Sequence, residues 1–250
     1  MIDNVIEEWL REKGHKLHFS LIDPDKQKVS EAAELASLCS SYGTDAIMVG
    51  GSTVNRKMTE KTTIAIKDVI DTPVIIFPNS AHAVNEFADY IFFMSLMNSR
   101  DRRFLIEEQF HGAPLVEKFG IYPIGMGYIV ISTSKKMTTV ERLGKLDIIR
   151  ENDIDKAVNY ALTAQYLGMH TVYLEAGSGA EKPVPNEMIM AVNDRLDIPI
   201  IVGGGIRNGK TARDKVEHGA DVIVTGTITE RNHKKIREII NAVKSFNMLD

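Results

Sequence analysis

The sequence predicts a modified TIM barrel, a single (β/α)8 domain over residues 1–250 with a short or missing third helix. Two observations carry this prediction. Eight short apolar runs rich in β-branched residues recur along the chain, and segments of helical periodicity separate most of them. Strands that alternate with helices form a parallel sheet, and near-continuous apolar strands are buried on both faces. Eight such units in 250 residues match the size of a closed barrel.

The eight predicted strands follow in order along the chain. They are residues 16–23, 45–51, 73–78, 90–96, 121–131, 171–177, 199–205 and 221–227. Helical periodicity is clearest in "SEAAELASLCSSYG", "DIDKAVNYALTAQYLG" and "TARDKVEHGA". The charged opening "MIDNVIEEWLREKG" also has a helical pattern and does not resemble a signal peptide. A doubly wound open sheet is the alternative, but the first and last units look equivalent and no second domain is visible, which favours the barrel.

Two connections depart from a regular barrel. Only "NSAHAVNEFAD" separates Pro78 from Tyr90, which is short for a crossover that carries a full helix. We therefore expect the third helix to be short or missing, leaving one flank of the barrel open. Residues 132–153 form a long polar stretch, and loops of that length are usually functional or mobile.

Composition narrows the function classes. The chain is 44% hydrophobic, with a formal net charge of −4 and no long basic run, which disfavours nucleic-acid binding. No apolar run approaches the ~20 residues that a membrane span needs. Cys39 is the single cysteine, so no internal disulfide can form and a reducing, cytoplasmic location is expected.

Glycines follow the last two predicted strands. Residues 203–205 are all glycine, and "TGT" occupies 225–227. In barrels the active site lies at the carboxyl ends of the strands, and the loops after strands seven and eight often bind phosphate. Glycine lets several backbone N–H groups converge on the phosphate oxygens without a Cβ in the way. These glycines would otherwise only form tight turns, but two clusters at the expected pair of strand ends favour a phosphate site.

The first two strands end in candidate metal ligands. Leu21 and Asp23 share one face of a strand, so Asp23 is expected at the barrel mouth. A carboxylate there suits Mg2+, which takes one or two carboxylates plus substrate phosphate oxygens. Because Pro24 follows, Asp23 could instead shape a turn or cap a helix. In "GGST", residues 50–53, the Ser52 hydroxyl could contact a metal or phosphate, or cap a helix.

The sixth strand carries a carboxylate in an apolar run. In "TVYLEAGSGA", Tyr173 and Glu175 lie on one face and Leu174 on the other. A glutamate in such a run is costly to bury unless it has a partner or a chemical role. Glu175 can accept a hydrogen bond from a substrate hydroxyl or act as a general base. The structural alternative is a buried ion pair.

Other notable residues are assigned to the core. The seven histidines form no HxxxH or HExxH cluster, so His18 is predicted to be packed rather than metal-bound. Cys39 lies in a helical run and is predicted to be core. The run "YIFFMSLMN" is mostly core as well, but it adjoins the short third connection, so part of it could line an apolar groove.

Taken together, these stretches resemble one family, the archaeal geranylgeranylglyceryl phosphate synthases with their bacterial heptaprenylglyceryl phosphate relatives. The matching stretches are "SLIDPDK", "IMVGGST", "VIIFP", "IFFMSLMNS", "GYIVI", "YLEAGSGA", "IVGGGIR" and "VIVTGT". They occur in order from about residue 17 to residue 227. The pair "YLEAGSGA" and "IVGGGIR" is the most specific.

The resemblance implies an activity and a set of site residues. A geranylgeranyl group would pass from geranylgeranyl diphosphate to the C3 hydroxyl of sn-glycerol 1-phosphate, forming the first ether bond of archaeal membrane lipids. Asp23 and Ser52 match the Mg2+ positions, and Glu175 matches the catalytic acid that contacts the acceptor hydroxyl. The residues that match the glycerol phosphate site are Tyr173, Leu174, Glu175, Ala176, Gly177, Ser178, Gly179, Gly203, Gly204, Gly226 and Thr227.

The same resemblance implies a homo-oligomer, either a dimer or a ring of dimers such as a hexamer. The open flank, through Phe77, Phe92 or their neighbours, would take the C20 chain, since each buried CH2 contributes about 0.8 kcal/mol.

Two other readings of the barrel stay open at this point. Phosphosugar isomerases and histidine-pathway barrels have similar glycine clusters, but they use two facing carboxylates, and this chain offers Asp23 without a matching aspartate after the fifth strand. A non-catalytic, phosphate-binding or regulatory barrel is the third reading.

Overall fold

A parallel sheet forms the centre of the molecule. The structure is a computed structural model and describes residues 4–51 and 55–246, with the side chains of 230, 231 and 233 left aside. Its strands are β1 (Leu17–Ile22), β2 (Ala46–Val49), β3 (Val74–Ile76), β4 (Tyr90–Leu96), β5 (Tyr122–Ser132), β6 (Ile149–Arg150), β7 (Thr171–Glu175), β8 (Ile200–Gly203) and β9 (Val222–Thr225). All eight strands predicted from the sequence are present, and β6 is an addition.

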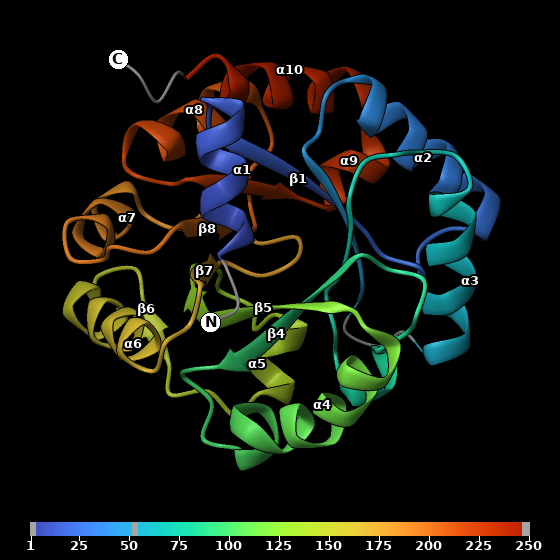
Figure 1. Ribbon diagram of the computed structural model, residues 1–250. Helices are drawn as coiled ribbons and strands as arrows, with labels where there is room; N and C mark the ends of the chain where they lie inside the picture. The colour runs from blue at the N-terminus through green and yellow to red at the C-terminus, as the bar shows by residue number, and fades with distance from the viewer. Residues whose placement is uncertain (1–3, 52–54, 247–250) are drawn as a thin grey trace.

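The sheet closes on itself. Its order is β4-β3-β2-β1-β9-β8-β7-β5, and β4 also pairs with β5, so eight parallel strands form a ring (Figure 1). The short strand β6 is added to the end of β5, where Ile131 lies opposite Ile149. The prediction of a closed barrel is therefore confirmed, and the open doubly wound sheet is excluded.

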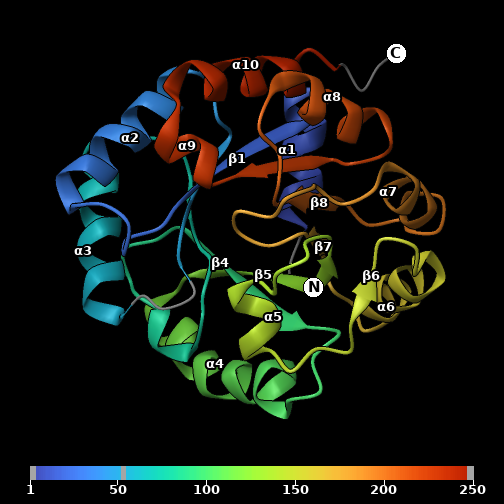
Figure 2. The same ribbon diagram turned by 180° about the vertical axis from the view of Figure 1, so that it is seen from behind.

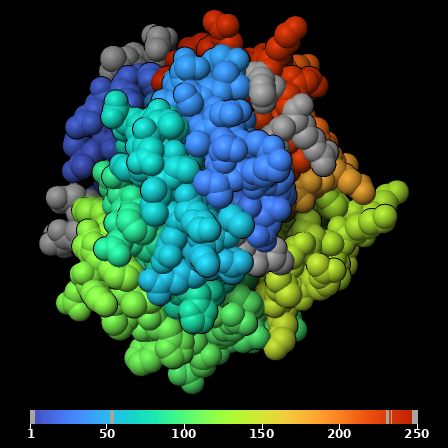
Figure 3. Space-filling model, turned by 90° about the vertical axis from the view of Figure 1, so that its right-hand side faces the viewer, coloured from blue at the N-terminus to red at the C-terminus, as the bar shows by residue number. Residues whose placement is uncertain are grey.

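Helices surround the ring (Figure 1). They are α1 (Val5–Lys13), α2 (Val29–Ser41), α3 (Arg56–Lys67), α4 (Glu108–Phe119), α5 (Thr139–Leu143), α6 (Ile154–Tyr166), α7 (Asn186–Asn193), α8 (Gly209–Glu217), α9 (Thr227–Arg231) and α10 (His233–Lys244). On the face seen in Figure 3, α2 and α3 lie side by side as an outer layer. Within the described residues, no helix combines the length and the apolar character that crossing a membrane requires.

The third connection lacks a full helix, as predicted. Between β3 and β4 the chain forms a single 3-10 turn, η1 (Ala81–Ala83). The next connection contains a π-helical turn, η2 (Arg103–Glu107), directly before α4. The wall of helices is therefore thinnest beside β3 and β4.

The polar stretch 132–153 is not a loop throughout, which corrects the expectation from the sequence. It contains α5 and β6. Helix α5 begins at a capping box, in which the backbone N–H and the hydroxyl of Thr138 both bond to Glu141 Oε2, at 2.6 and 2.7 Å. This T-x-x-E signal was present in the sequence and marks the helix start.

Helix α1 closes the end of the barrel at which the strands begin. Helix α1 lies across the end where the strands begin, in front of the ring in Figure 1. Its Trp9 makes edge-to-face contacts with Phe19 and Tyr90, with ring centroids 6.0 and 5.2 Å apart. In the view from behind, α5 and α9 lie at the opposite end (Figure 2). Because α1 closes one end, only the carboxyl ends of the strands are left for a site.

Candidate functional site

A cavity of about 510 Å3 opens at the carboxyl ends of β1, β7, β8 and β9, and we call it the mouth cavity. Eight of the predicted site residues line it: Asp23, Tyr173, Glu175, Ser178, Gly179, Gly204, Gly226 and Thr227. The structure thus brings together residues that are about 200 positions apart in the sequence.

Glu175 lies at the end of β7, and its side chain is almost completely buried, with 7% of the residue exposed. It accepts hydrogen bonds from the Gly177 backbone N–H, at 2.5 Å, and from the Tyr173 hydroxyl. Burial raises the pKa of Glu175, while these two hydrogen bonds favour the ionised form and limit the rise. Among the described residues no cation forms an ion pair with Glu175, so the ion-pair alternative is not supported. A carboxylate tuned in this way suits proton transfer.

Close neighbouring atoms explain why glycine occupies positions 203 and 204. A Cβ at Gly203 would overlap the Tyr173 hydroxyl, and one at Gly204 would lie 2.5 Å from Glu175 Oε1. Gly204 and Gly205 also have positive φ angles of 82° and 71°, which L side chains rarely adopt. These glycines therefore make room for the functional side chains of β7 as well as exposing bare main chain.

The second glycine turn lines the same cavity and follows the neighbouring strand, β9. Gly226 separates β9 from α9 and lines the mouth cavity together with Thr227. The hydroxyls of Thr227 and Ser178 are 3.4 Å apart, which joins the loop after β7 to the start of α9. Bare main chain and hydroxyl groups thus face one space, an arrangement that can hold an anion.

Asp23 lies at the end of β1, on the rim of the same cavity. Its Oδ1 accepts the backbone N–H of Asp25 at 3.1 Å, which is the turn role that Pro24 suggested. Its Oδ2 lies 3.3 Å from Lys26 Nζ, and the side chain is 17% exposed. A Cβ at Gly51 would overlap Asp23 Oδ1, so the carboxylate packs directly against the bare backbone of Gly51.

The other predicted metal ligand, Ser52, lies outside the described residues. Within the described part of the chain, no group of three or more His, Cys, Asp or Glu side chains is placed to hold a metal. Of the two predicted metal ligands, Asp23 and Ser52, the structure therefore describes only Asp23.

Four predicted site residues do not line the mouth cavity with their side chains. Leu174 and Ala176 point outward and pack in the core between the sheet and the helices. Gly177 lies against Thr138, the residue before α5, and Gly203 lies within β8 behind Tyr173. Any contact that these four make with a ligand is limited to the main chain.

A second cavity, of about 160 Å3, occupies the place of the missing third helix, and we call it the flank cavity. Most of its lining is apolar and comes from η1, β4 and α4, including Phe77, Val84, Phe92, Phe93, Met94, Leu96 and Val116. The sequence prediction that Phe77 and part of "YIFFMSLMN" line an apolar groove is confirmed. The mouth cavity and the flank cavity share three residues, Phe77, Tyr128 and Val140.

Sequence reasoning missed several lining residues. Tyr128 reaches the cavity from the middle of the sheet and Val140 from α5, so only the folded chain brings them there. Arg207 lines the rim and donates to the carbonyl oxygens of Glu181, at 2.9 Å, and Ala180, which ties down the loop after β7. The basic residue directly after "GGGI" was the signal that could have identified Arg207.

A closed parallel barrel with its cavity at the carboxyl ends of the strands, and glycine turns after its last two strands, defines the class as (β/α)8-barrel enzymes. Within that class the chain belongs to the PcrB family, whose model matches residues 7–243.

Several similar proteins are geranylgeranylglyceryl phosphate synthases. A geranylgeranylglyceryl phosphate synthase from Methanococcoides burtonii is 47% identical over 96% of this chain and 99% of its own length. Another from Pyrococcus horikoshii is 45% identical over 96% of this chain and 95% of its own. The crystal structure of the Thermoplasma acidophilum enzyme, solved with its substrate sn-glycerol-1-phosphate, is 40% identical with a TM-score of 0.91, covering 96% of this chain and 98% of that one. The resemblance drawn from the motifs is confirmed.

Proposed function

We propose that this chain is a prenyltransferase that moves a geranylgeranyl group from geranylgeranyl diphosphate to the C3 hydroxyl of sn-glycerol 1-phosphate. The observation that carries the proposal is the shared wall of Phe77, Tyr128 and Val140, where a cavity for anions meets an apolar one. A reaction that joins a charged, water-soluble acceptor to a long hydrocarbon donor needs both kinds of site in contact.

The acceptor occupies the mouth cavity. Its phosphate lies against the glycine turns of Gly204 and Gly226, where backbone N–H groups and the Thr227 hydroxyl supply donors. The Thermoplasma acidophilum relative was solved with its substrate sn-glycerol-1-phosphate, which supports glycerol phosphate as the acceptor. With the phosphate held at β8 and β9, the C3 hydroxyl points towards Glu175 on β7.

Glu175 orients the acceptor hydroxyl and takes its proton. A new bond forms between the glycerol C3 oxygen and C1 of the prenyl group as the bond from C1 to the diphosphate oxygen breaks. The proton leaves on Glu175 and the electron pair of the breaking bond leaves on pyrophosphate. The raised pKa of Glu175 makes it a stronger base than an exposed glutamate, and the Tyr173 hydroxyl holds it in place.

The donor tail occupies the flank cavity. Burial contributes about 0.8 kcal/mol for each CH2, so the tail supplies a large part of the donor's binding energy. Aromatic rings gather at the junction, where Phe77 lies 5.6 Å from Tyr128 and 6.2 Å from Phe92 between ring centroids. Such rings stabilise the positive charge that develops on an allylic carbon as its diphosphate leaves.

A magnesium ion held by Asp23 is part of the proposal. The Asp23 carboxylate lies at the rim of the mouth cavity, and Mg2+ is commonly held by one or two carboxylates plus phosphate oxygens. Asp23 would hold the ion, with Ser52 as the second ligand that the sequence suggests. When bound, the ion neutralises charge on the diphosphate and so makes pyrophosphate a better leaving group.

We also propose that the chain is cytoplasmic, as its single cysteine suggests, and that it associates with further copies of itself. Helices α6 and α7 pack together and expose Tyr166, Leu167 and Met190, which are 78%, 68% and 47% accessible. Apolar side chains on adjacent helices suit an interface with a second copy. Light scattering on the purified chain measures the mass, and a monomer at all concentrations would contradict this part.

One assay tests the proposed reaction. Radiolabelled sn-glycerol 1-phosphate and geranylgeranyl diphosphate are incubated with Mg2+ or with EDTA, and organic-extractable label is counted. We expect product with Mg2+ and none with EDTA. The variant Glu175→Gln should still bind glycerol phosphate but lose turnover. An absence of product with Mg2+ present, or conversion of a phosphosugar in its place, would overturn the proposal.

A further inference from the structure

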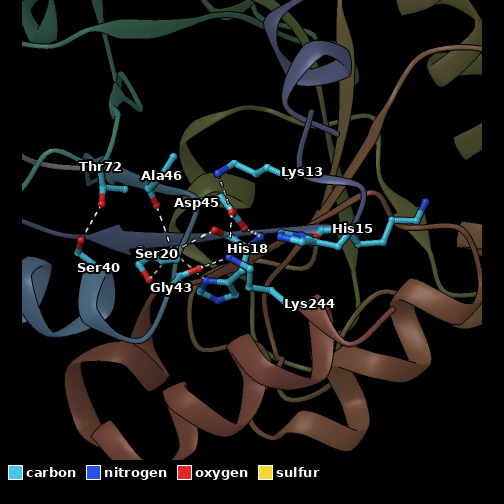
Figure 4. Close-up of polar contacts among 12 residues, drawn as sticks. Lys13, His15, His18, Ser20, Ser40, Gly43, Asp45, Ala46, Thr72 and Lys244 are labelled. Carbon is cyan, nitrogen blue, oxygen red and sulfur yellow. Dashed lines mark hydrogen bonds and ion pairs between the residues drawn. The ribbon is translucent and has the colours of Figure 1, made fainter. Parts of the chain in front are cut away.

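His18 is a buried histidine that the proposed reaction does not use. On β1, Leu17, Phe19 and Leu21 face the inside of the barrel, so His18 faces the surrounding helices. No part of it is accessible to solvent. Figure 4 shows it among polar side chains from β1, from the start of β2 and from α10.

Both ring nitrogens of His18 are hydrogen-bonded to threonine hydroxyls. Nδ1 lies 3.0 Å from Thr44 Oγ1, and Nε2 lies 2.9 Å from Thr225 Oγ1. The Thr44 hydroxyl donates its proton to a carbonyl oxygen, that of His18 at 2.9 Å, because a carbonyl can only accept. Thr44 Oγ1 must then accept from Nδ1–H, so we assign the ring proton to Nδ1. Nε2 is left as an acceptor, and the Thr225 hydroxyl donates to it.

The hydrogen bond from the Thr225 hydroxyl to His18 Nε2 matters because Thr225 starts the second glycine turn. Thr225 ends β9, and the turn of residues 225–227 lines the mouth cavity. The Thr229 hydroxyl holds Thr225 from the other side, 3.1 Å from both its Oγ1 and its carbonyl oxygen. The Thr229 backbone N–H also bonds to the Gly226 carbonyl at 2.9 Å. His18 and Thr229 together therefore fix the backbone of Gly226.

The His18 ring is neutral at neutral pH. Burial lowers the pKa of His18 to about 3, opposed by the charge of Asp45 and assisted by that of Lys244. The Asp45 carboxylate is already bonded, to the His18 backbone N–H and to Lys13 and Lys244 (Figure 4). A neutral ring keeps Nε2 available as an acceptor for Thr225.

We infer that His18 is a positioning residue for the acceptor phosphate, acting through Thr225 on the backbone of Gly226 and Thr227. The inference rests on the proposed function, because it takes this turn to be where the phosphate binds. His18 touches neither cavity and takes no part in the bond-making step. Its loss should therefore weaken acceptor binding and leave the donor site unaffected.

The test compares three variants. Thr225→Val removes the hydroxyl that bonds to Nε2, and His18→Gln replaces the ring. Ser20→Ala is the matched control, because Ser20 is equally buried, bonds to Thr44 at 3.2 Å and lines neither cavity. Kd for sn-glycerol 1-phosphate is measured by calorimetry, and KM for both substrates and kcat are measured with Mg2+.

We expect Thr225→Val and His18→Gln to raise Kd and KM for glycerol phosphate roughly fivefold, the effect of one hydrogen bond of about 1 kcal/mol. KM for geranylgeranyl diphosphate and kcat should change by less than about twofold, and Ser20→Ala should bind like the wild type. The inference, but not the proposed function, would be overturned if acceptor binding, KM for geranylgeranyl diphosphate and kcat were all impaired alike, or if acceptor binding were normal in both variants. A wild-type chain that does not bind glycerol phosphate would overturn the inference and the proposed function together.

Discussion

The hydroxyl group of Tyr173 occupies the space that a side chain at Gly203 would need. The two residues lie on neighbouring strands, β7 and β8, and a Cβ at Gly203 would also lie 2.9 Å from two ring carbons of Tyr173. Tyr173 in turn donates its hydroxyl to Glu175. The absence of a side chain on one strand thus allows the carboxylate on the next strand to be held in place.

This relationship predicts a compensating pair of mutations. Gly203→Ala should lower the free energy of unfolding by roughly 1–3 kcal/mol, because it overpacks a rigid interior. Adding Tyr173→Phe removes the hydroxyl and should recover part of that loss. Urea unfolding of the two single variants and the double variant measures the coupling. Strictly additive effects would show that the two groups do not compete for space.

Gly204→Ala should abolish most turnover. Its φ of 82° is strained for alanine, and its Cβ would lie 2.5 Å from Glu175 Oε1, so the carboxylate must move. Gly168→Ala is the control, because Gly168 has a φ of 80° with no atom within 4 Å of a Cβ. Both variants place an alanine at nearly the same positive φ. Steady-state kcat should therefore fall in the first alone, and an equal fall in both would contradict the assigned role of Glu175.

The flank cavity can be tested through Gly112 on α4, which lines it. A Cβ there would make ordinary contacts, 3.8 Å from Ala81 Cβ and Val84 Cγ2. Gly112→Ala should raise stability, since alanine favours a helix interior over glycine by roughly 0.5–1 kcal/mol, and should keep activity. Gly112→Leu should fill the cavity and lower turnover of geranylgeranyl diphosphate more than that of geranyl diphosphate. Equal losses with both donors would place the tail elsewhere.

Asp23 and Asp25 form a matched pair for the metal prediction. Asp23→Asn should lower kcat about a hundredfold, because the lost metal ligand removes several kcal/mol of charge stabilisation. Asp25→Asn makes the same change on an exposed side chain outside both cavities and should leave kcat within about twofold. Binding of glycerol phosphate should survive in both variants. If acceptor binding and turnover fall alike in Asp23→Asn, the proposed metal role is wrong.

The pKa of His18 predicts an acid-sensitive contribution to stability. Burial lowers this pKa from 6.5 to about 3, with Asp45 and Lys244 as the facing charges. Between these values the unfolded chain binds a proton that the folded chain does not, so stability falls as the pH drops from 6.5 towards 3. His18→Gln should show a shallower decline in urea midpoint over this window. Parallel declines in the variant and the wild type would mean that His18 is protonated in the folded chain.

The strands and the missing helix were readable from the sequence because both depend on local pattern. Apolar runs set β1 to β5 and β7 to β9, and the eleven residues between Pro78 and Tyr90 are too few for a crossover helix. The end of each strand also identified Asp23 and Glu175, since the barrel places all strand ends around one opening.

The rest of the site depends on contacts between distant segments. Gly203 leaves room for the Tyr173 hydroxyl, which reaches over from the adjacent strand. The spacing of residues in the sequence does not reveal this contact. Val140 reaches both cavities because α5 turns back over the barrel. The buried position of His18 was predicted, but its link to Thr225 joins β1 to β9 across 207 positions.

Where other barrels have a third helix, this one has the three residues of η1 and a hollow behind them. If the donor binds as proposed, its hydrocarbon tail would take the place of that helix against β3 and β4 and complete the outer layer while it is bound. The donor would then be part of the architecture as well as a reactant. An unreactive analogue should make the whole chain harder to melt, by an amount that grows with the number of carbons in its tail.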